Sequence, residues 1–206
     1  MKIEDLYNFN IIDDPQISND GNFIAYTETI ALKQDNSYCS KIVIYEIVSK
    51  KIIHEVSDNY KNCYPRWNKQ NELIYLNINK ENNNFKINIL DLYKKNSRII
   101  FELDKSVSDI QISVCDNYIS FLKYEDDLLN DDHYLKQDVL FLERFNWKSD
   151  SSGFNGNSYK HLYIYDLKNS VLKKLTNGKY DVNGYAWSNK GSNIAIITNK
   201  SNSNEF

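Results

Sequence analysis

The sequence predicts an all-β protein built from repeated hairpins, and three observations carry this prediction. A phrase of twelve residues occurs four times along the chain. Tyr and Phe are abundant, with 16 and 9 residues, and aromatic residues of this kind are enriched in strands. Hydrophobic residues make up 41% of the 206 residues, which is more than a disordered chain carries.

The repeated phrase is predicted to join two strands through a tight polar turn. Its copies are residues 15–26, 65–76, 110–121 and 185–196, and the third position is always apolar: Ile17, Trp67, Ile112 and Trp187. Gly21 and Gly191 end the turn in the first and last copies, where glycine supplies a left-handed backbone. Asn71 and Asp116 take this place in the other two copies, and both residue types tolerate positive φ.

A second hairpin phrase follows the first three copies of the repeat, at residues 41–56, 85–103 and 161–176. Two hairpins give four antiparallel strands, which is the content of one blade of a β-propeller. Recurrence of such a unit at intervals of roughly 45 to 75 residues is typical of a repeat architecture. We therefore expect a partial β-propeller of about three and a half four-stranded antiparallel blades.

The blades follow one another along residues 1–206, which we expect to form one partial propeller. Blade one is predicted at residues 14–57, blade two at 64–103, blade three at 109–176 and the start of blade four at 184–199. An insertion at residues 125–158 interrupts blade three with an acidic segment, an extended segment and a glycine-bearing loop. The polar tail, residues 200–206, is expected to fray.

Composition excludes several classes of function. The net charge of −3 provides no basic field for nucleic acid or an anionic membrane. The first residues contain no apolar leader, and no run approaches the ~18 apolar residues of a spanning helix. The three cysteines, Cys39, Cys63 and Cys115, are therefore expected to be reduced thiols in the cytoplasm. Cys63 and Cys115 lie beside or within repeat phrases and are interpreted as buried packing residues.

No cofactor or metal site is predicted. His54 and His161 lie on expected strands, where packing or a backbone hydrogen bond explains them better than metal ligation. The acidic segment of the insertion is interpreted as a solvated loop, with divalent cation binding as the alternative. Its candidate ligands are Asp126, Asp127, Asp131, Asp132 and His133.

Read together, the phrases resemble the amino-terminal propeller of the prolyl oligopeptidase (S9) family of serine peptidases. Within that family, the phrases are most similar to those of the acylaminoacyl-peptidase and dipeptidyl-peptidase-like branch. The segments that carry this resemblance are Asp14–Tyr26, Trp147–Phe154, Leu175–Val182 and Trp187–Ala195. The resemblance implies seven blades placed before an α/β-hydrolase domain with a Ser, Asp and His triad. The propeller would then gate access to that domain.

The chain departs from this pattern, because none of its six glycines lies in a Gly-x-Ser-x-Gly nucleophile elbow. No catalytic residue is therefore predicted, and the chain is expected to be inactive alone, as a propeller portion that lacks the hydrolase domain. The alternative is a free-standing TolB-like or WD40-like propeller module that binds a protein or peptide.

Substrate and partner contacts are also expectations of the resemblance. In related peptidases, propeller acids near the central face hold a peptide amino terminus, so Glu143 beside Arg144 is a substrate-binding candidate. An exposed ion pair on a strand is the simpler interpretation of Glu143 and Arg144. Trp67, Trp147 and Trp187 are expected to pack between blades. Open faces on the first and last blades predict self-association or a complementing chain. A peptide substrate is expected only for a full-length enzyme.

Overall fold

A computed structural model of the protein describes residues 2–58, 61–79, 84–103, 107–125, 148–149, 153–154 and 158–200. The chain divides into two compact units, one of residues 1–106 with 110–112 and one of residues 107–109 with 113–206. Within these described residues the regular structure is β-strand, as the sequence predicts, apart from a short 3-10 helix, η1 (Ile3–Asn8), which was not predicted.

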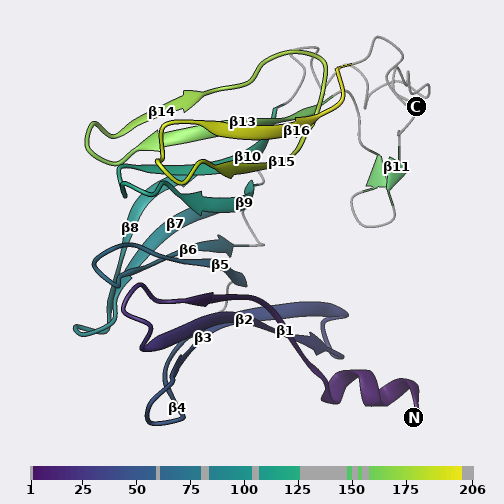
Figure 1. The fold of residues 1–206 in the computed structure, drawn as a ribbon. Coiled ribbons are helices and arrows are strands. Elements are labelled where there is room, and N and C mark those ends of the chain that lie inside the picture. The colour runs from purple at the N-terminus through teal and green to yellow at the C-terminus, as the bar shows by residue number, and fades with distance from the viewer. Residues whose placement is uncertain are drawn as a thin grey trace. The chain divides into compact units, whose positions relative to one another are not determined.

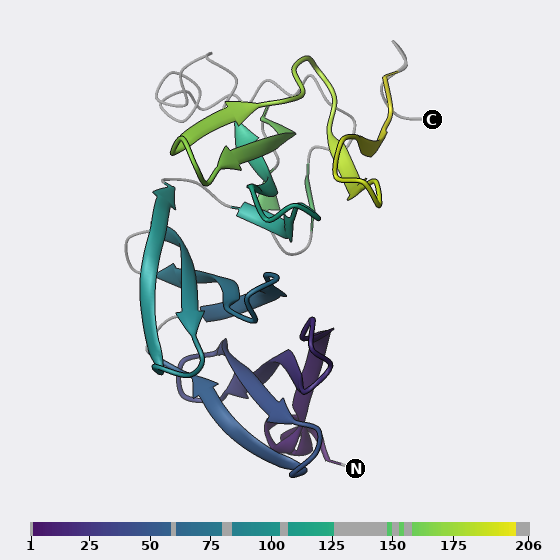
Figure 2. The ribbon, with the colours of Figure 1, turned by 60° about the vertical axis from the view of Figure 1, so that its left-hand side comes forward.

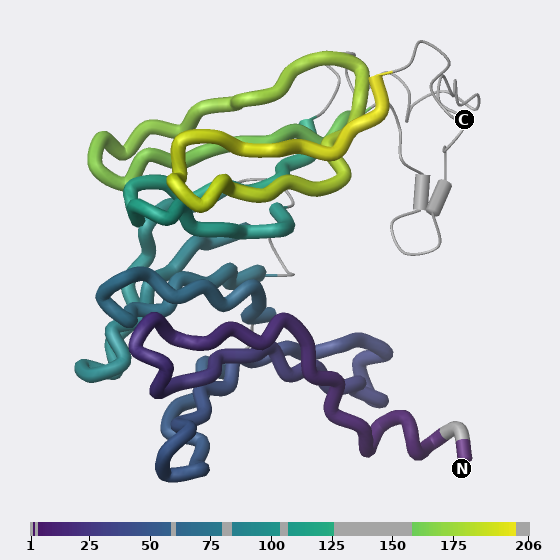
Figure 3. Tube along the Cα trace, viewed as in Figure 1, coloured from purple at the N-terminus to yellow at the C-terminus, as the bar shows by residue number. Residues whose placement is uncertain are grey.

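The first unit contains two four-stranded antiparallel sheets in chain order (Figure 1). Blade one consists of β1 (Asn10–Ile17), β2 (Phe23–Leu32), β3 (Ser37–Glu46) and β4 (Lys51–Val56). Blade two consists of β5 (Lys61–Trp67), β6 (Leu73–Asn79), β7 (Asn84–Asp91) and β8 (Asn96–Leu103). Each strand pairs with the next along the chain, so each blade is a meander that can be followed along the tube in Figure 3.

The second unit contains most of blade three and the beginning of blade four (Figure 2). Blade three has the strand order β14-β13-β10-β9, and its strands are β9 (Val107–Ile112), β10 (Tyr118–Glu125), β13 (Tyr159–Asp166) and β14 (Val171–Lys174). Between β10 and β13 the structure describes one short hairpin, β11 (Lys148–Ser149) with β12 (Gly153–Phe154). Blade four is the two-stranded pair β15 (Val182–Trp187) and β16 (Ile194–Thr198). These sheets confirm the predicted fold class of a partial propeller.

The turn of the repeated phrase has the same backbone in all four copies. The seventh residue lies in the left-handed region, with φ of 72° at Gly21, 57° at Asn71, 57° at Asp116 and 67° at Gly191. In every copy its amide donates to the carbonyl of the fourth residue, at 2.8 to 3.1 Å. The prediction that Asn71 and Asp116 replace glycine without loss of the turn is therefore confirmed.

The fourth residue of the phrase holds the turn with its side chain. The hydroxyls of Ser18, Ser113 and Ser188 accept the amide N–H of the residue five positions later. In the second copy the Asn68 carboxamide oxygen accepts from the amides of Gln70 and Glu72 instead. That turn is one residue shorter, so Leu73 lies opposite Trp67 where the first and last copies place their tenth residue.

The two blades of the first unit pack face to face. We call the face that carries the third phrase residue the front face and the opposite one the rear face. The rear face of blade one contributes Phe23, Ala25, Ile42 and Ile44 to the shared core, and the front face of blade two contributes Trp67, Leu73, Tyr75 and Leu90. All eight side chains are at most 8% exposed. Burial of each large apolar side chain contributes about 1.5–3 kcal/mol, so this contact stabilises the unit substantially.

The second unit repeats this packing on a smaller scale. Leu122 and Leu162 of blade three share a core with Val182 and Tyr185 of blade four. Trp187, Ile194 and Ile196 on the front face of blade four are partly buried against this core. Consecutive blades in both units are therefore held by the front face of the later blade.

Replacement of Gly21 by alanine tests the backbone requirement of the turn. A Cβ atom at Gly21 would meet nothing within 4 Å, so only the φ of +72° penalises it. Gly21→Ala should lower the free energy of unfolding by about 1–2 kcal/mol. Gly21→Asn should cost clearly less, because Asn71 adopts this conformation in the second copy. Urea denaturation measures both variants, and equal losses would contradict the explanation.

Candidate functional site

The first strands of the blades are bent at one repeated position. The pairing register shifts between Asp13 and Gln16 in β1, and between Cys63 and Arg66 in β5, as in a β-bulge. The residue just before the phrase is left-handed at Asp14, Tyr64 and Asp109, with φ of 51°, 55° and 50°. In blades one and two the first strand therefore begins before its phrase and carries a bulge where the phrase starts.

This bulge was not predicted from the sequence. A signal was present, because aspartate precedes the phrase in the first and third copies and tolerates left-handed backbone. The second copy breaks this pattern, because Tyr64 takes the place of aspartate and a bulky residue is rarely left-handed.

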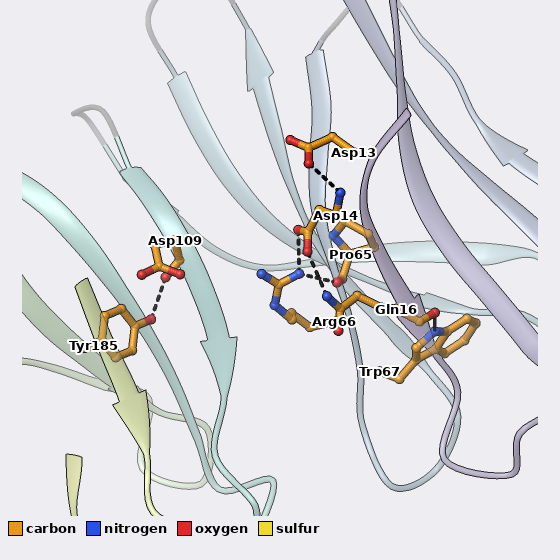
Figure 4. A network of polar contacts seen from close by, with 8 residues as sticks. All are labelled: Asp13, Asp14, Gln16, Pro65, Arg66, Trp67, Asp109 and Tyr185. Atoms are coloured by element: carbon orange, nitrogen blue, oxygen red, sulfur yellow. Dashed lines mark hydrogen bonds and ion pairs between the residues drawn. The ribbon is translucent and has the colours of Figure 1, made fainter. Parts of the chain in front are cut away.

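The bulge of blade one binds an arginine from blade two (Figure 4). The Arg66 Nη1 atom lies 2.6 Å from Asp14 Oδ2, and it also donates to the Pro65 carbonyl at 2.7 Å. Gln16 Nε2 donates to the other carboxylate oxygen of Asp14 at 2.8 Å. The Arg66 and Asp14 side chains are 15% and 21% exposed, so this ion pair is less screened by water than a surface pair.

Trp67 adds a second polar contact between the same blades. Its indole N–H donates to the carbonyl of Gln16 at 3.0 Å, as Figure 4 shows, and its ring stacks on Phe23 with centroids 6.2 Å apart. The indole therefore contributes both apolar area and a hydrogen bond that fixes its orientation. This agrees with the expected place of Trp67 between blades.

The second unit repeats the arrangement with other residues. The Tyr185 hydroxyl of blade four donates to the carbonyl of Asp109, the left-handed residue before the phrase of blade three, at 2.5 Å (Figure 4). The Trp187 indole donates to the Ser120 hydroxyl at 2.7 Å and stacks on Tyr118. In both units, side chains of the later blade's first strand therefore bond to the preceding blade.

The two described histidines lie on strands, as the sequence predicts. His161 is 2% exposed, and its Nδ1 atom lies 3.1 Å from the Thr176 hydroxyl. That hydroxyl also accepts the Leu162 amide N–H, so the pair is a buried structural contact and not an accessible nucleophile with its base. Burial lowers the pKa of His161, and nearby Lys174 lowers it further. Burial likewise lowers the pKa of His54.

The cysteines differ from one another. Cys63 is buried, as predicted, and burial raises the pKa of its thiol to about 12. The same prediction is wrong for Cys115, which is exposed because it lies in the turn of the third phrase copy. A hydrogen bond with the Ser113 hydroxyl lowers the pKa of Cys115.

Several predicted positions lie outside the described residues, namely Glu143, Arg144, Trp147 and the candidate ligands Asp126, Asp127, Asp131, Asp132 and His133. Within the part of the chain that the structure describes, no three His, Cys, Asp or Glu side chains gather as a metal site would require. Among the same residues, no helix has the length and apolar character needed to cross a membrane. The described site thus consists of polar contacts that fix neighbouring blades against each other.

A double-mutant cycle measures the Asp14–Arg66 contact. Asp14→Asn and Arg66→Met should each destabilise the first unit, and together they should destabilise it less than their sum by about 1 kcal/mol. Lys94→Met is the control, since Lys94 is 79% exposed in its ion pair with Asp91 and should change stability little. Denaturant titration reports all variants, and a coupling energy near zero would contradict a cooperative contact.

The lowered pKa values of His54 and His161 predict a pH dependence of folding. Because both pKa values lie below 6.5, the ordinary value of a histidine, the unfolded chain binds more protons than the folded chain as the solution becomes acidic. The stability that the neutral imidazoles provide is fully present above pH 6.5 and is lost as pH falls through the lowered pKa values. Thermal melts between about pH 7.5 and 5.5 should show this loss. The His54→Gln/His161→Gln variant should show a flatter curve, and an unchanged curve would refute the assignment.

Comparisons with known proteins agree with this architecture. No protein-family model matches the chain. The uncharacterized peptidase YuxL of Bacillus subtilis is 22% identical over 193 residues, which are 91% of this chain and 29% of YuxL. The acylaminoacyl peptidase of Pyrococcus horikoshii superposes with a TM-score of 0.69 at 16% identity, over 88% of this chain and 27% of that one. TolB of Acinetobacter baumannii gives 0.57 at 17% identity, over 95% of this chain and 39% of that one.

The chain thus spans less than a third of the length of the two peptidases that it matches. The structural likenesses, all at low identity, establish the fold. The resemblance read from the repeat phrases is confirmed at this level: the chain is a partial β-propeller of the kind found in acylaminoacyl peptidases of the S9 family and in TolB.

Proposed function

We propose that the chain is the amino-terminal propeller portion of an S9-family serine peptidase of the acylaminoacyl-peptidase type. The observation that carries the proposal is the ordered series of repeat phrases on blades that superpose on such an enzyme. The weaker sequence likeness to a bacterial peptidase supports it independently. In this proposal, the hydrolytic reaction belongs to a catalytic domain outside the 206 residues, and the protein acts in the cytoplasm.

The role of the propeller is to select substrates by size. The blades of a propeller surround a central channel. Contacts such as Asp14 with Arg66 hold consecutive first strands in fixed positions, so they limit how far neighbouring blades can separate. A channel whose blades cannot separate excludes folded proteins and admits thin peptides. This selection depends on the shape of the channel more than on particular side chains.

Activity measurements on two proteins test this proposal. The 206-residue chain alone should not hydrolyse acetyl-alanyl p-nitroanilide, because no nucleophile elbow lies in its sequence. The complete reading frame that contains this chain should hydrolyse it, and a serine-directed fluorophosphonate should abolish that activity. Hydrolysis by the chain alone that the fluorophosphonate removes would overturn the assignment.

The gating role has its own readout in the complete protein. Arg66→Met should raise the hydrolysis of longer peptides relative to the short substrate, since loss of the Asp14 contact loosens neighbouring blades. Lys94→Met should leave this ratio unchanged, because Lys94 is exposed at a turn. An identical ratio in both variants would exclude gating by this contact.

A second candidate function is a free-standing binding module, which the likeness to TolB favours. The two candidates differ in what the gene encodes next to this chain. Further blades and a Gly-x-Ser-x-Gly elbow in the same frame support the peptidase, whereas a frame without them supports the binding module.

A further inference from the structure

The loop between β14 and β15 contains an asparagine followed by a glycine, Asn177 and Gly178. Both residues are exposed to water. Gly178 has a φ of +127°, which residues with a Cβ atom rarely adopt, and a Cβ atom there would lie 2.9 Å from a ring carbon of Tyr180. The backbone of this loop therefore requires glycine directly after the asparagine.

The side chain of Asn177 is oriented by an ammonium group. Lys174 Nζ lies 3.3 Å from Asn177 Oδ1. Because a lysine ammonium only donates hydrogen bonds, the carboxamide oxygen faces it and the NH2 group points away. The same ammonium forms an ion pair with the Glu125 carboxylate, which holds it in place. A positive charge at Oδ1 stabilises the negative charge that develops on this oxygen when a nucleophile attacks the carboxamide carbon.

The backbone amide of Gly178 is a nucleophile within reach of that carbon, since attack closes a succinimide ring. Among the described residues, none accepts a hydrogen bond from this amide. Its proton is therefore open to removal by water or hydroxide. The absence of a side chain on glycine also leaves the nitrogen sterically unhindered.

We propose that Asn177 and Gly178 form a site of spontaneous deamidation, with water as the co-reactant. The Gly178 nitrogen loses its proton to solvent and bonds to the side-chain carbonyl carbon of Asn177. The bond from this carbon to the NH2 group breaks, and ammonia leaves. Water then adds to either carbonyl carbon of the cyclic imide, and the bond from that carbon to the ring nitrogen breaks. One opening gives aspartate, and the other gives isoaspartate, whose main chain continues through the side-chain carbon.

The modification acts on contacts that fix the end of blade three. Its new carboxylate lies beside Lys174 and competes with Glu125 for the ammonium. Isoaspartate also lengthens the main chain directly after Thr176, whose hydroxyl bonds to His161 and to the Leu162 amide. Accumulation of isoaspartate should therefore weaken the attachment of this loop to blade three.

A second pair of the same type provides an internal control. Asn183 and Gly184 lie within β15, and Gly184 pairs with Ile197 of β16. Ring closure at Asn183 would require the main chain to leave this strand pairing, so it should be much slower. Another such pair, Asn155 and Gly156, lies outside the described residues.

Peptide mass spectrometry of the 206-residue chain, incubated in mildly alkaline buffer made with ¹⁸O-labelled water, tests the proposal. Asn177 should be converted faster than Asn183, with uptake of the label and formation of isoaspartate. Lys174→Met should slow conversion at Asn177 by about threefold, the size expected of a charge contact that water screens. Glu125→Gln is the matched control, because it breaks the ion pair but keeps the ammonium, and it should not slow the reaction.

An Asn177 that stays intact, or that is converted no faster than Asn183, would overturn the proposed site. Unchanged or faster conversion in Lys174→Met would overturn the role of the ammonium. Thermal melts establish that the variants fold, and they also measure the consequence for blade three. The incubated chain should melt at a lower temperature than the fresh chain, whereas Asn177→Gln should keep its melting temperature because its longer side chain closes a ring far more slowly. Equal losses in both proteins would contradict an effect of this site.

The result is independent of the peptidase assignment, since the reaction needs only residues of this loop and water.

Discussion

The need to cover two faces of every blade is the constraint on which the rest of this structure depends. A twisted four-stranded sheet with apolar residues on both faces is stable only when neighbours cover them. In the first unit this requirement brings the front face of blade two onto the rear face of blade one. The second unit meets it with Trp187 and Tyr185 against blade three. The polar contacts near the start of each phrase then fix how the two packed sheets are aligned.

This constraint explains why polar and apolar contacts occur together between blades. Trp67 buries its ring against Phe23 while its N–H satisfies the Gln16 carbonyl, and Arg66 of the same strand neutralises Asp14. Apolar burial supplies most of the stability, whereas the hydrogen bonds and the ion pair fix the alignment of the blades. The proposed selection of substrates by size would require this alignment as much as it requires stability.

Much of the fold could be predicted from the sequence, because turn chemistry and strand alternation are local. Gly21, Asn71, Asp116 and Gly191 identify the phrase turns through their tolerance of positive φ, and the structure has all four. The bulges could not be predicted in the same way, since Tyr64 adopts a conformation that its residue type disfavours. Long-range contacts could not be predicted either, because the partner of Arg66 lies 52 residues away in the sequence. Cys115 was misjudged because its place in the turn, and not its residue type, decides its exposure.

The left-handed backbone just before the phrase is shared by Asp14, Tyr64 and Asp109, although tyrosine and aspartate are unlike side chains. What recurs from blade to blade is thus the path of the main chain. Different residue types can adopt this path, each at its own energetic cost. Chains that share few residues can therefore build the same backbone path. This accounts for a chain that superposes well on an archaeal enzyme at 16% identity while no family profile recognises it.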